Sequence, residues 1–226
     1  MKVLPVALVL AVLTAWQVDS QEILTADRFM QALSAHYATV QDYEAEIAIR
    51  SGGSNMVGTA SYLAPSSMRI DFSQPSNQVI VFAGGSLTVF LPDLRVVLNQ
   101  EIGGNSSTAG ASLASEEGLL LLRRNYVPAF VSSPEPIPLE AGSQEQVVKI
   151  RLLRRNISEG FREIILSVNP KTNLIRRIEA TTMANVVVQF DFSSIRINTG
   201  IPELRFAYTP PAGSSTITNF MFRNSN

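Results

Sequence analysis

The chain has 226 residues, of which 18 are lysine or arginine and 19 are aspartate or glutamate, so its formal net charge is −1. Because there is no excess of basic residues, the composition does not indicate nucleic acid as a partner. The chain has no cysteine, which excludes a disulfide framework and a lipid-anchored N-terminal cysteine.

The first residues have the pattern of a secretory leader. Lys2 precedes an apolar run over residues 3–15, which is too short to cross a membrane as a helix. We expect a signal peptide at residues 1–20, cleaved after Ser20, followed by a single soluble domain at residues 21–226. The alternative is an uncleaved membrane anchor, which the polar residues at the end of the run disfavour.

Residues 25–40 predict the first helix, because Thr25 can cap it and Phe29 and Leu33 recur at helical spacing. Its apolar face either packs on an ordinary core or covers a ligand cavity. His36 is the single histidine of the sequence, and with no cysteine it does not indicate a metal site.

Residues 42–50 alternate apolar and charged side chains, which predicts a strand with one solvated face. Glu44 and Glu46 share that charged face, where nothing excludes water or raises a pKa, so they do not indicate acid/base catalysis. The glycine-rich residues 51–55 predict a hairpin into a second strand at residues 57–63.

The stretch over residues 65–98 predicts an antiparallel meander. Met68, Ile70 and Phe72 alternate with polar residues, as in a half-buried strand that ends near Ser73. Further strands are predicted at 78–83, 87–91 and 95–98, with a glycine pair and Pro92 as breaks.

The glycine- and serine-rich residues 103–115 predict a loop. A short helix follows, with acidic residues Glu116 and Glu117 at its start and four leucines that either pack on the sheet or also line a cavity. The proline-rich residues 132–138 predict a connector that is neither helix nor central strand.

Four more strands are predicted in the second half of the chain, at residues 146–153, 162–168, 174–181 and 185–197. This half has a basic outer face, which is either solvated or docks a partner or lipid headgroups. Its arginines are Arg151, Arg154, Arg155, Arg162, Arg176 and Arg177. Residues 201–213 then predict a proline-flanked strand, and residues 216–222 an additional edge strand.

The succession MRIDF, LTVFLPDLRVV and IPELRFAYTPPAG resembles the periplasmic outer-membrane lipoprotein carrier family, LolA. This resemblance implies a mainly β fold with some α: an unclosed antiparallel β-barrel, or half-barrel, covered by short helices that enclose an apolar cavity. From the residues alone, a dry sandwich is the alternative. In several family members an arginine stands just before the proline that precedes the MRIDF strand, and it hydrogen-bonds the lid when the carrier is empty. This chain has Ala64 at that place, before Pro65, so the resemblance does not imply an empty form that is locked closed.

The resemblance implies a monomeric periplasmic carrier that is not an enzyme, has no cofactor and binds the acyl chains of lipoproteins or other lipids. An inner-membrane releasing transporter and an outer-membrane acceptor are the implied partners. The alternatives are a lipid- or lipoprotein-sensing regulatory module of similar fold and a structural protein with a dry core. We expect these residues to line the cavity: Phe29, Leu33, Met68, Ile70, Phe72, Ile80, Phe82, Val89, Leu119, Leu122, Val188 and Phe190.

Overall fold

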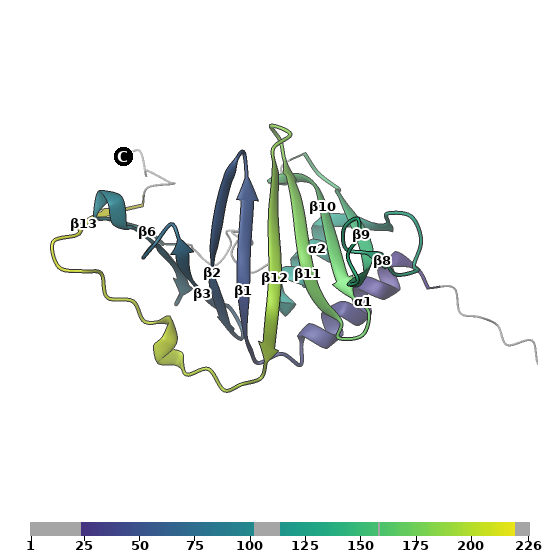
Figure 1. Cartoon of the computed structure of the whole chain (residues 1–226), viewed down its shortest axis with the longest axis horizontal. Coiled ribbons are helices and arrows are strands. Elements are labelled where there is room, and N and C mark those ends of the chain that lie inside the picture. Colours follow the sequence, from purple (N-terminus) through teal and green to yellow (C-terminus); the bar gives the residue numbers. More distant parts are fainter. Residues whose placement is uncertain (1–23, 102–113, 158, 220–226) are drawn as a thin grey trace, which may run out of the picture.

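The computed structural model describes residues 24–101, 114–157 and 159–219 (Figure 1). Its main feature is an open sheet in which 13 strands are described and whose two end strands, β13 and β7, are not paired with each other. Both described α-helices lie beside the half of the sheet that contains β9 to β11 (Figure 1). The predicted fold class, an unclosed and mainly antiparallel sheet with short helices, is confirmed.

The first half of the sheet is a meander in sequence order, as the alternating pattern predicts. Each strand pairs antiparallel with the next. The strands are β1 (Asp42–Ser51), β2 (Ser54–Leu63), β3 (Ser67–Gln74), β4 (Val79–Ala83), β5 (Ser86–Leu91) and β6 (Val96–Glu101). The 3-10 turn η1 (Pro92–Leu94) begins at the proline that ends β5.

The second half runs back to meet the first, because β12 pairs antiparallel with β1 in the middle of the sheet. Its strands are β7 (Tyr126–Phe130), β8 (Ile137–Pro138), β9 (Gln146–Arg154), β10 (Phe161–Asn169), β11 (Leu174–Thr182) and β12 (Val187–Ile197). The sequence did not predict β7, which starts directly after a helix and contains Pro128. A proline is tolerated there because β7 is an edge strand.

The two helices end close to where the sequence predicts. Helix α1 (Ala26–Tyr37) has Thr25 as its N-cap, and the Thr25 hydroxyl accepts a hydrogen bond from the Arg28 amide at 3.2 Å. Helix α2 (Glu116–Asn125) is capped by Ser115, whose hydroxyl accepts from the Gly118 amide at 3.1 Å. Acidic first turns and basic last turns agree with the helix dipole in both.

The C-terminal segment corrects one prediction. The strand expected over residues 201–213 is wrong: this stretch contains the 3-10 turn η3 (Glu203–Phe206) and otherwise pairs with no strand. Its prolines lack the amide hydrogens that a ladder needs. An edge strand does follow, β13 (Ser215–Thr218), but it pairs parallel with β6. We call residues 199–219 the C-terminal strap.

The core lies between the helices and one face of the sheet, here called the inner face. One cluster contains Met30 and Leu33 of α1, Leu119 of α2, and inner-face residues such as Ile150 and Leu166. The opposite, outer face carries a smaller apolar cluster on β4 to β6, made of Val79, Val81, Phe90 and Val97 with Tyr208 of the strap against it. Both faces of the sheet are therefore apolar over β4 to β6.

Several predictions fall outside the described residues: the signal peptide at residues 1–20, most of the loop at residues 103–115, and the chain from residue 220 on. Within the described ranges, no helix combines the length and the hydropathy that a membrane span needs.

Candidate lipid-binding face

The inner face of the first half presents a continuous apolar row across four neighbouring strands. Ile70 of β3 is opposite Ile80 of β4, which is opposite Val89 of β5, which is opposite Leu98 of β6. Residues directly opposite each other project on the same side, so these side chains share one face. All four are half-buried, and the row spans roughly 14 Å at the usual spacing of strands.

The twelve predicted cavity residues divide by burial. The buried ones are Leu33, Met68, Phe72, Leu119 and Leu122, and the half-buried ones are Phe29, Ile70, Ile80, Phe82, Val89, Val188 and Phe190. Eleven of them belong to or pack on the main cluster, and Val89 lies beyond it on the inner face. The structure therefore brings them to one side of the sheet. Four of the half-buried ones, Ile70, Ile80, Phe82 and Val89, lie on the half where neither helix has its main contacts.

The inner face contains further residues that the sequence analysis did not select. Leu87 and Leu91 flank Val89 at period two on β5, and Leu98 continues the row on β6. All three are half-buried. The alternation in residues 87–91 was a sufficient signal for the first two of them.

Beneath α1 the same face is closely packed. An apolar pocket between Tyr37, Tyr43 and the ends of β11 and β12 has a volume of about 10 Å³, which is room for about one water molecule. The Tyr43 hydroxyl is buried there and has no hydrogen-bond partner among the described residues. This part of the cluster is therefore a packed core in the present conformation, whereas the half-buried row across β3 to β6 offers accessible apolar surface.

Three tyrosines lie in or next to this packed region. The Tyr37 hydroxyl accepts a hydrogen bond from the Ile175 amide at 3.0 Å, and Tyr43 stacks on Tyr62 with ring centroids 5.1 Å apart. Burial raises the pKa of Tyr37 and of Tyr43 well above the ordinary value, and burial with nearby Glu116 raises that of Tyr62 to about 12. All three phenols are therefore neutral at physiological pH, so the face carries no charge from them.

The outer face of the same half is covered by the strap. The guanidinium of Arg69 donates to Asp71 and to the carbonyl oxygens of Arg205 and Ala207, and lies 5.7 Å from the ring centre of Tyr208. The alternation correctly predicts that Arg69 points away from the apolar inner face. It does not reveal that Arg69 holds another segment of the chain.

The six arginines expected to form a basic outer face differ in their partners. Arg151 pairs with Glu163 at 2.6 Å, Arg176 pairs with Glu145, and Arg177 pairs with Asp191 and Glu140. The remaining three are Arg154, Arg155 and Arg162. Within the described ranges these three form no ion pair, so the cationic surface is smaller than the sequence suggests.

Groups suited to catalysis or metal binding do not come together in the described parts of the chain. No three histidine, cysteine or carboxylate residues lie close enough there to hold a metal ion. His36 lies on α1, with its ring edge-on to that of Tyr37 at 6.1 Å between centroids. Glu44 pairs with Arg196, and Glu46 accepts hydrogen bonds from Ser193 and Ser194, so both carboxylates are part of the surface polar network.

Comparisons with known proteins agree with this architecture. Residues 53–209 match the family model described as outer membrane lipoprotein carrier protein LolA. An outer-membrane lipoprotein carrier protein of Bordetella avium is 22% identical over 160 residues, which are 71% of this chain and 70% of that protein.

Solved structures share the fold at lower identity. An uncharacterized conserved protein from Thermus thermophilus superposes with a TM-score of 0.55 at 10% identity, covering 85% of this chain and 98% of that one. The crystal structure of MucB gives a TM-score of 0.54 at 12% identity, covering 81% of this chain and 62% of that one. The open sheet, the two helices and the match over most of the chain lead to one conclusion: this protein belongs to the LolA family of outer membrane lipoprotein carrier proteins.

Proposed function

We propose that this protein is a periplasmic carrier that binds the acyl chains of lipoproteins on the inner face of its sheet and moves them from the inner to the outer membrane. Members of the family are carriers and not enzymes. The observation that supports the proposal is the half-buried row of Ile70, Ile80, Val89 and Leu98, an apolar surface that no ordinary solvated sheet needs to keep accessible.

The energetics require such a surface. Burying an acyl chain stabilises a complex by ~0.8 kcal/mol per methylene, so one long chain represents on the order of ten kcal/mol before ordering costs. Lipid tails of that size do not cross water unaided, and a wall of branched aliphatic side chains with Phe82 beside it is suited to cover them. The proposed donor is an inner-membrane releasing transporter, and the proposed acceptor is an outer-membrane protein.

The direct test compares a charge placed in the inner-face row with the same charge placed at a matched control position. Val89→Glu puts a carboxylate among the half-buried inner residues, whereas Thr88→Glu puts the same group on the opposite face of the same strand. We expect both variants to fold. Val89→Glu should lose displacement of a fluorescent apolar probe by a long-chain lipopeptide, and Thr88→Glu should keep it.

Chain length supplies the second arm of the test. Long-chain lipopeptides should displace the probe, and short-chain analogues should do so poorly, because fewer methylenes are buried. Equal competition by both, or equal binding by the two variants, would contradict an acyl-binding wall. We also propose that the mature protein starts at Gln21, which the intact mass of the exported protein tests.

A further inference from the structure

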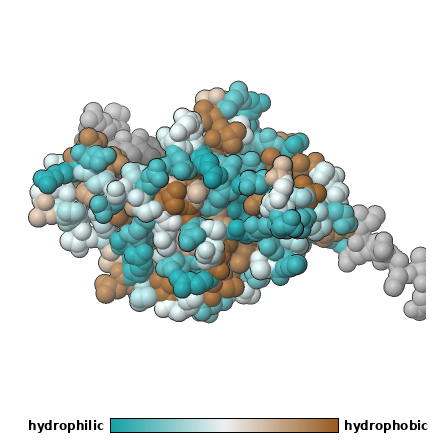
Figure 2. All heavy atoms as spheres, viewed as in Figure 1, coloured by the Kyte–Doolittle hydropathy of each residue, from teal (hydrophilic) through white to brown (hydrophobic). Residues whose placement is uncertain are grey.

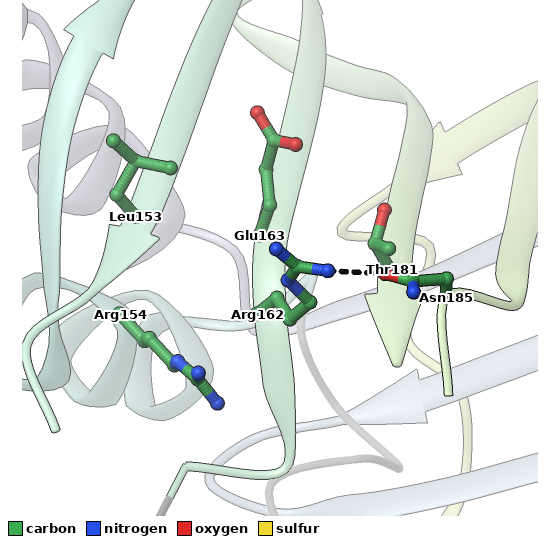
Figure 3. Close-up of a pocket in the computed structure, with 6 residues that line it drawn as sticks. All are labelled: Leu153, Arg154, Arg162, Glu163, Thr181 and Asn185. Carbon is green, nitrogen blue, oxygen red and sulfur yellow. Dashed lines mark hydrogen bonds between the residues drawn. The ribbon is translucent and has the colours of Figure 1, made fainter. Parts of the chain in front are cut away.

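A second surface lies on the outer face of the sheet, at the end of β9 to β12 where the β11–β12 hairpin turns. A depression of about 500 Å³ is found there (Figure 3), lined by Leu153, Arg154, Arg162, Glu163, Thr181 and Asn185. Leu153, Glu163 and Thr181 are cross-strand neighbours that alternate with the buried inner residues Leu152 and Ile164. The depression is therefore on the opposite side of the sheet from the inner-face row that is proposed to bind acyl chains.

The depression is cationic. Arg162 donates to the side-chain oxygen of Asn185, and Arg154 donates to the sulfur of Met183, so both guanidiniums have neutral partners. The carboxylate of Glu163 is already paired with Arg151 at 2.6 Å. In the described parts of the chain, neither Arg154 nor Arg162 has a carboxylate within ion-pair distance, and both retain donors for an anion.

Exposed aliphatic side chains lie at the same end of the sheet as these charges. Met183, Val186 and Val187 belong to the hairpin and have exposed fractions of 47%, 41% and 47%, and Leu153 in the depression is 47% exposed. Figure 1 shows that the β11–β12 turn extends beyond the neighbouring turns, and Figure 2 shows hydrophobic atoms gathered over that end of the molecule. A single exposed aliphatic residue is ordinary, but a group at a projecting tip, beside two arginines that pair with no carboxylate among the described residues, is not.

We propose that this end of the sheet docks on the surface of a bilayer that contains anionic phospholipids. The guanidiniums of Arg154 and Arg162 bind headgroup phosphates, and Met183 and Val186 enter the interface below them. A bilayer supplies both chemistries at the required depths: a layer of phosphates with an apolar boundary directly beneath. Free phosphate would satisfy the arginines and leave the aliphatic tip without a role.

The test is sedimentation of the full mature protein with vesicles. Vesicles of phosphatidylglycerol mixed with phosphatidylcholine should bind the protein at low salt, and binding should fall as the salt concentration rises. Pure phosphatidylcholine vesicles should bind it poorly. Reversing both charges with Arg154→Glu and Arg162→Glu should lower partitioning about tenfold or more, and Met183→Asn with Val186→Asn should lower it several-fold.

The control carries the same change in net charge at distant sites. The control is the double variant Arg95→Glu with Lys171→Glu. Arg95 lies in an exposed turn of the first half of the sheet, and Lys171 lies in the exposed β10–β11 turn at the opposite end. This double variant should bind vesicles as the parent does. Equal losses in the control and in the Arg154 and Arg162 variant would show that only net charge matters, which overturns the proposal. Competition by millimolar inorganic phosphate, with no effect of the Met183 and Val186 changes, would identify a free-phosphate site and also overturn it. The proposal does not depend on cargo binding, and circular dichroism confirms that each variant folds.

Discussion

Arg205 and Asp71 form a salt bridge across the outer face, with Arg205 Nη2 2.6 Å from Asp71 Oδ2, although 134 residues separate them in the sequence. Arg69 binds the same carboxylate, with Nη2 2.8 Å from Oδ1. Burial raises the pKa of Asp71, but the two guanidiniums outweigh burial and hold it below its usual value. One carboxylate thus fixes the strap to β3.

Asp71→Asn should loosen the strap and lower the free energy of unfolding by about 1–3 kcal/mol, because two partly buried guanidiniums lose their charged partner. Urea denaturation measures the loss, and trypsin should cleave after Arg205 faster than in the parent. The control is Glu44→Gln, which removes the partner of the exposed Arg196 and should change stability by about 0.5 kcal/mol or less. Unchanged proteolysis in Asp71→Asn would show that the apolar contacts and the hydrogen bonds from Arg69 to the strap carbonyls hold the strap without this carboxylate.

Asp42 joins the start of β1 to the end of β12. Its Oδ1 accepts from the Thr199 amide at 2.8 Å and the Thr199 hydroxyl at 3.0 Å, and its Oδ2 accepts from the Gly200 amide at 3.0 Å. Burial raises the pKa of this carboxyl, but the hydrogen bonds together lower it below the ordinary 3.8. The stability that Asp42 contributes is therefore fully present above that value and is lost as the pH falls through the lower folded-state pKa.

Asp42→Asn should consequently lower the free energy of unfolding at pH 7 by about 1.5–3 kcal/mol and weaken the decline in stability below about pH 4. Thermal unfolding between pH 7 and pH 2 measures both effects. Thr199→Val, which removes only the hydroxyl donor, should give an intermediate loss at pH 7. A parent-like decline in Asp42→Asn below pH 4 would mean that other carboxyls determine the acid sensitivity.

Alternation predicted the strands and the faces of the first half of the sheet. Met68, Ile70 and Phe72 do share the inner face, because period two fixes the side on which a residue projects. Alternation cannot predict what covers that side. Met68 is 5% exposed and lies opposite Tyr62, whereas Val89, two strands away, is half-buried. The difference depends on where the helices pack, which is a long-range property.

The strap and β7 could not be read from the sequence for related reasons. Arg69 and Asp71 are typical of a solvated strand face, and only a contact with residues more than 130 positions away makes them half-buried. The five residues of β7 include Pro128 and are too few to establish a period. Their partner, β9, lies beyond a long connector. In both cases the local pattern was weak and the pairing was non-local.

Met68 is buried, so a charge placed there should destabilise the fold. Met68→Glu should unfold the protein or cost several kcal/mol, because the carboxylate would be buried between Tyr62 and Phe82 without a partner. Val89→Glu, on the half-buried part of the same face, should remain folded. Thermal unfolding of the two variants measures this difference. A stable Met68→Glu protein would mean that the cavity extends further under the helices than the packed conformation indicates.

Arg69 also faces outward on β3, but Arg69→Glu would not be a neutral control for Met68→Glu and Val89→Glu. It would place a carboxylate beside Asp71 and remove the donors to the carbonyl oxygens of Arg205 and Ala207. We expect it to destabilise the strap much as Asp71→Asn does, and trypsin cleavage after Arg205 measures this. Thr88→Glu is the better control because Thr88 also faces outward and has no charged group directly opposite it.

Gly58 is required where β2 and β3 approach each other at a shift in register, between the pairs Val57–Gln74 and Gly58–Phe72. A Cβ atom there would lie 2.3 Å from the backbone oxygen of Asp71 and 2.9 Å from the Cα atom of Phe72. Both are backbone atoms of a paired strand and cannot give way without disturbing the ladder. Gly58→Ala should therefore lower the free energy of unfolding by about 3 kcal/mol, at the upper end of the usual cost of overpacking.

Gly160→Ala is the matched control, because a Cβ atom at Gly160 meets nothing within 4 Å, and its urea midpoint should stay within error of the parent. Similar midpoints for the two variants would show that β2 and β3 can separate at this bulge, and the inner face would then be adjustable at the strand that carries Phe72.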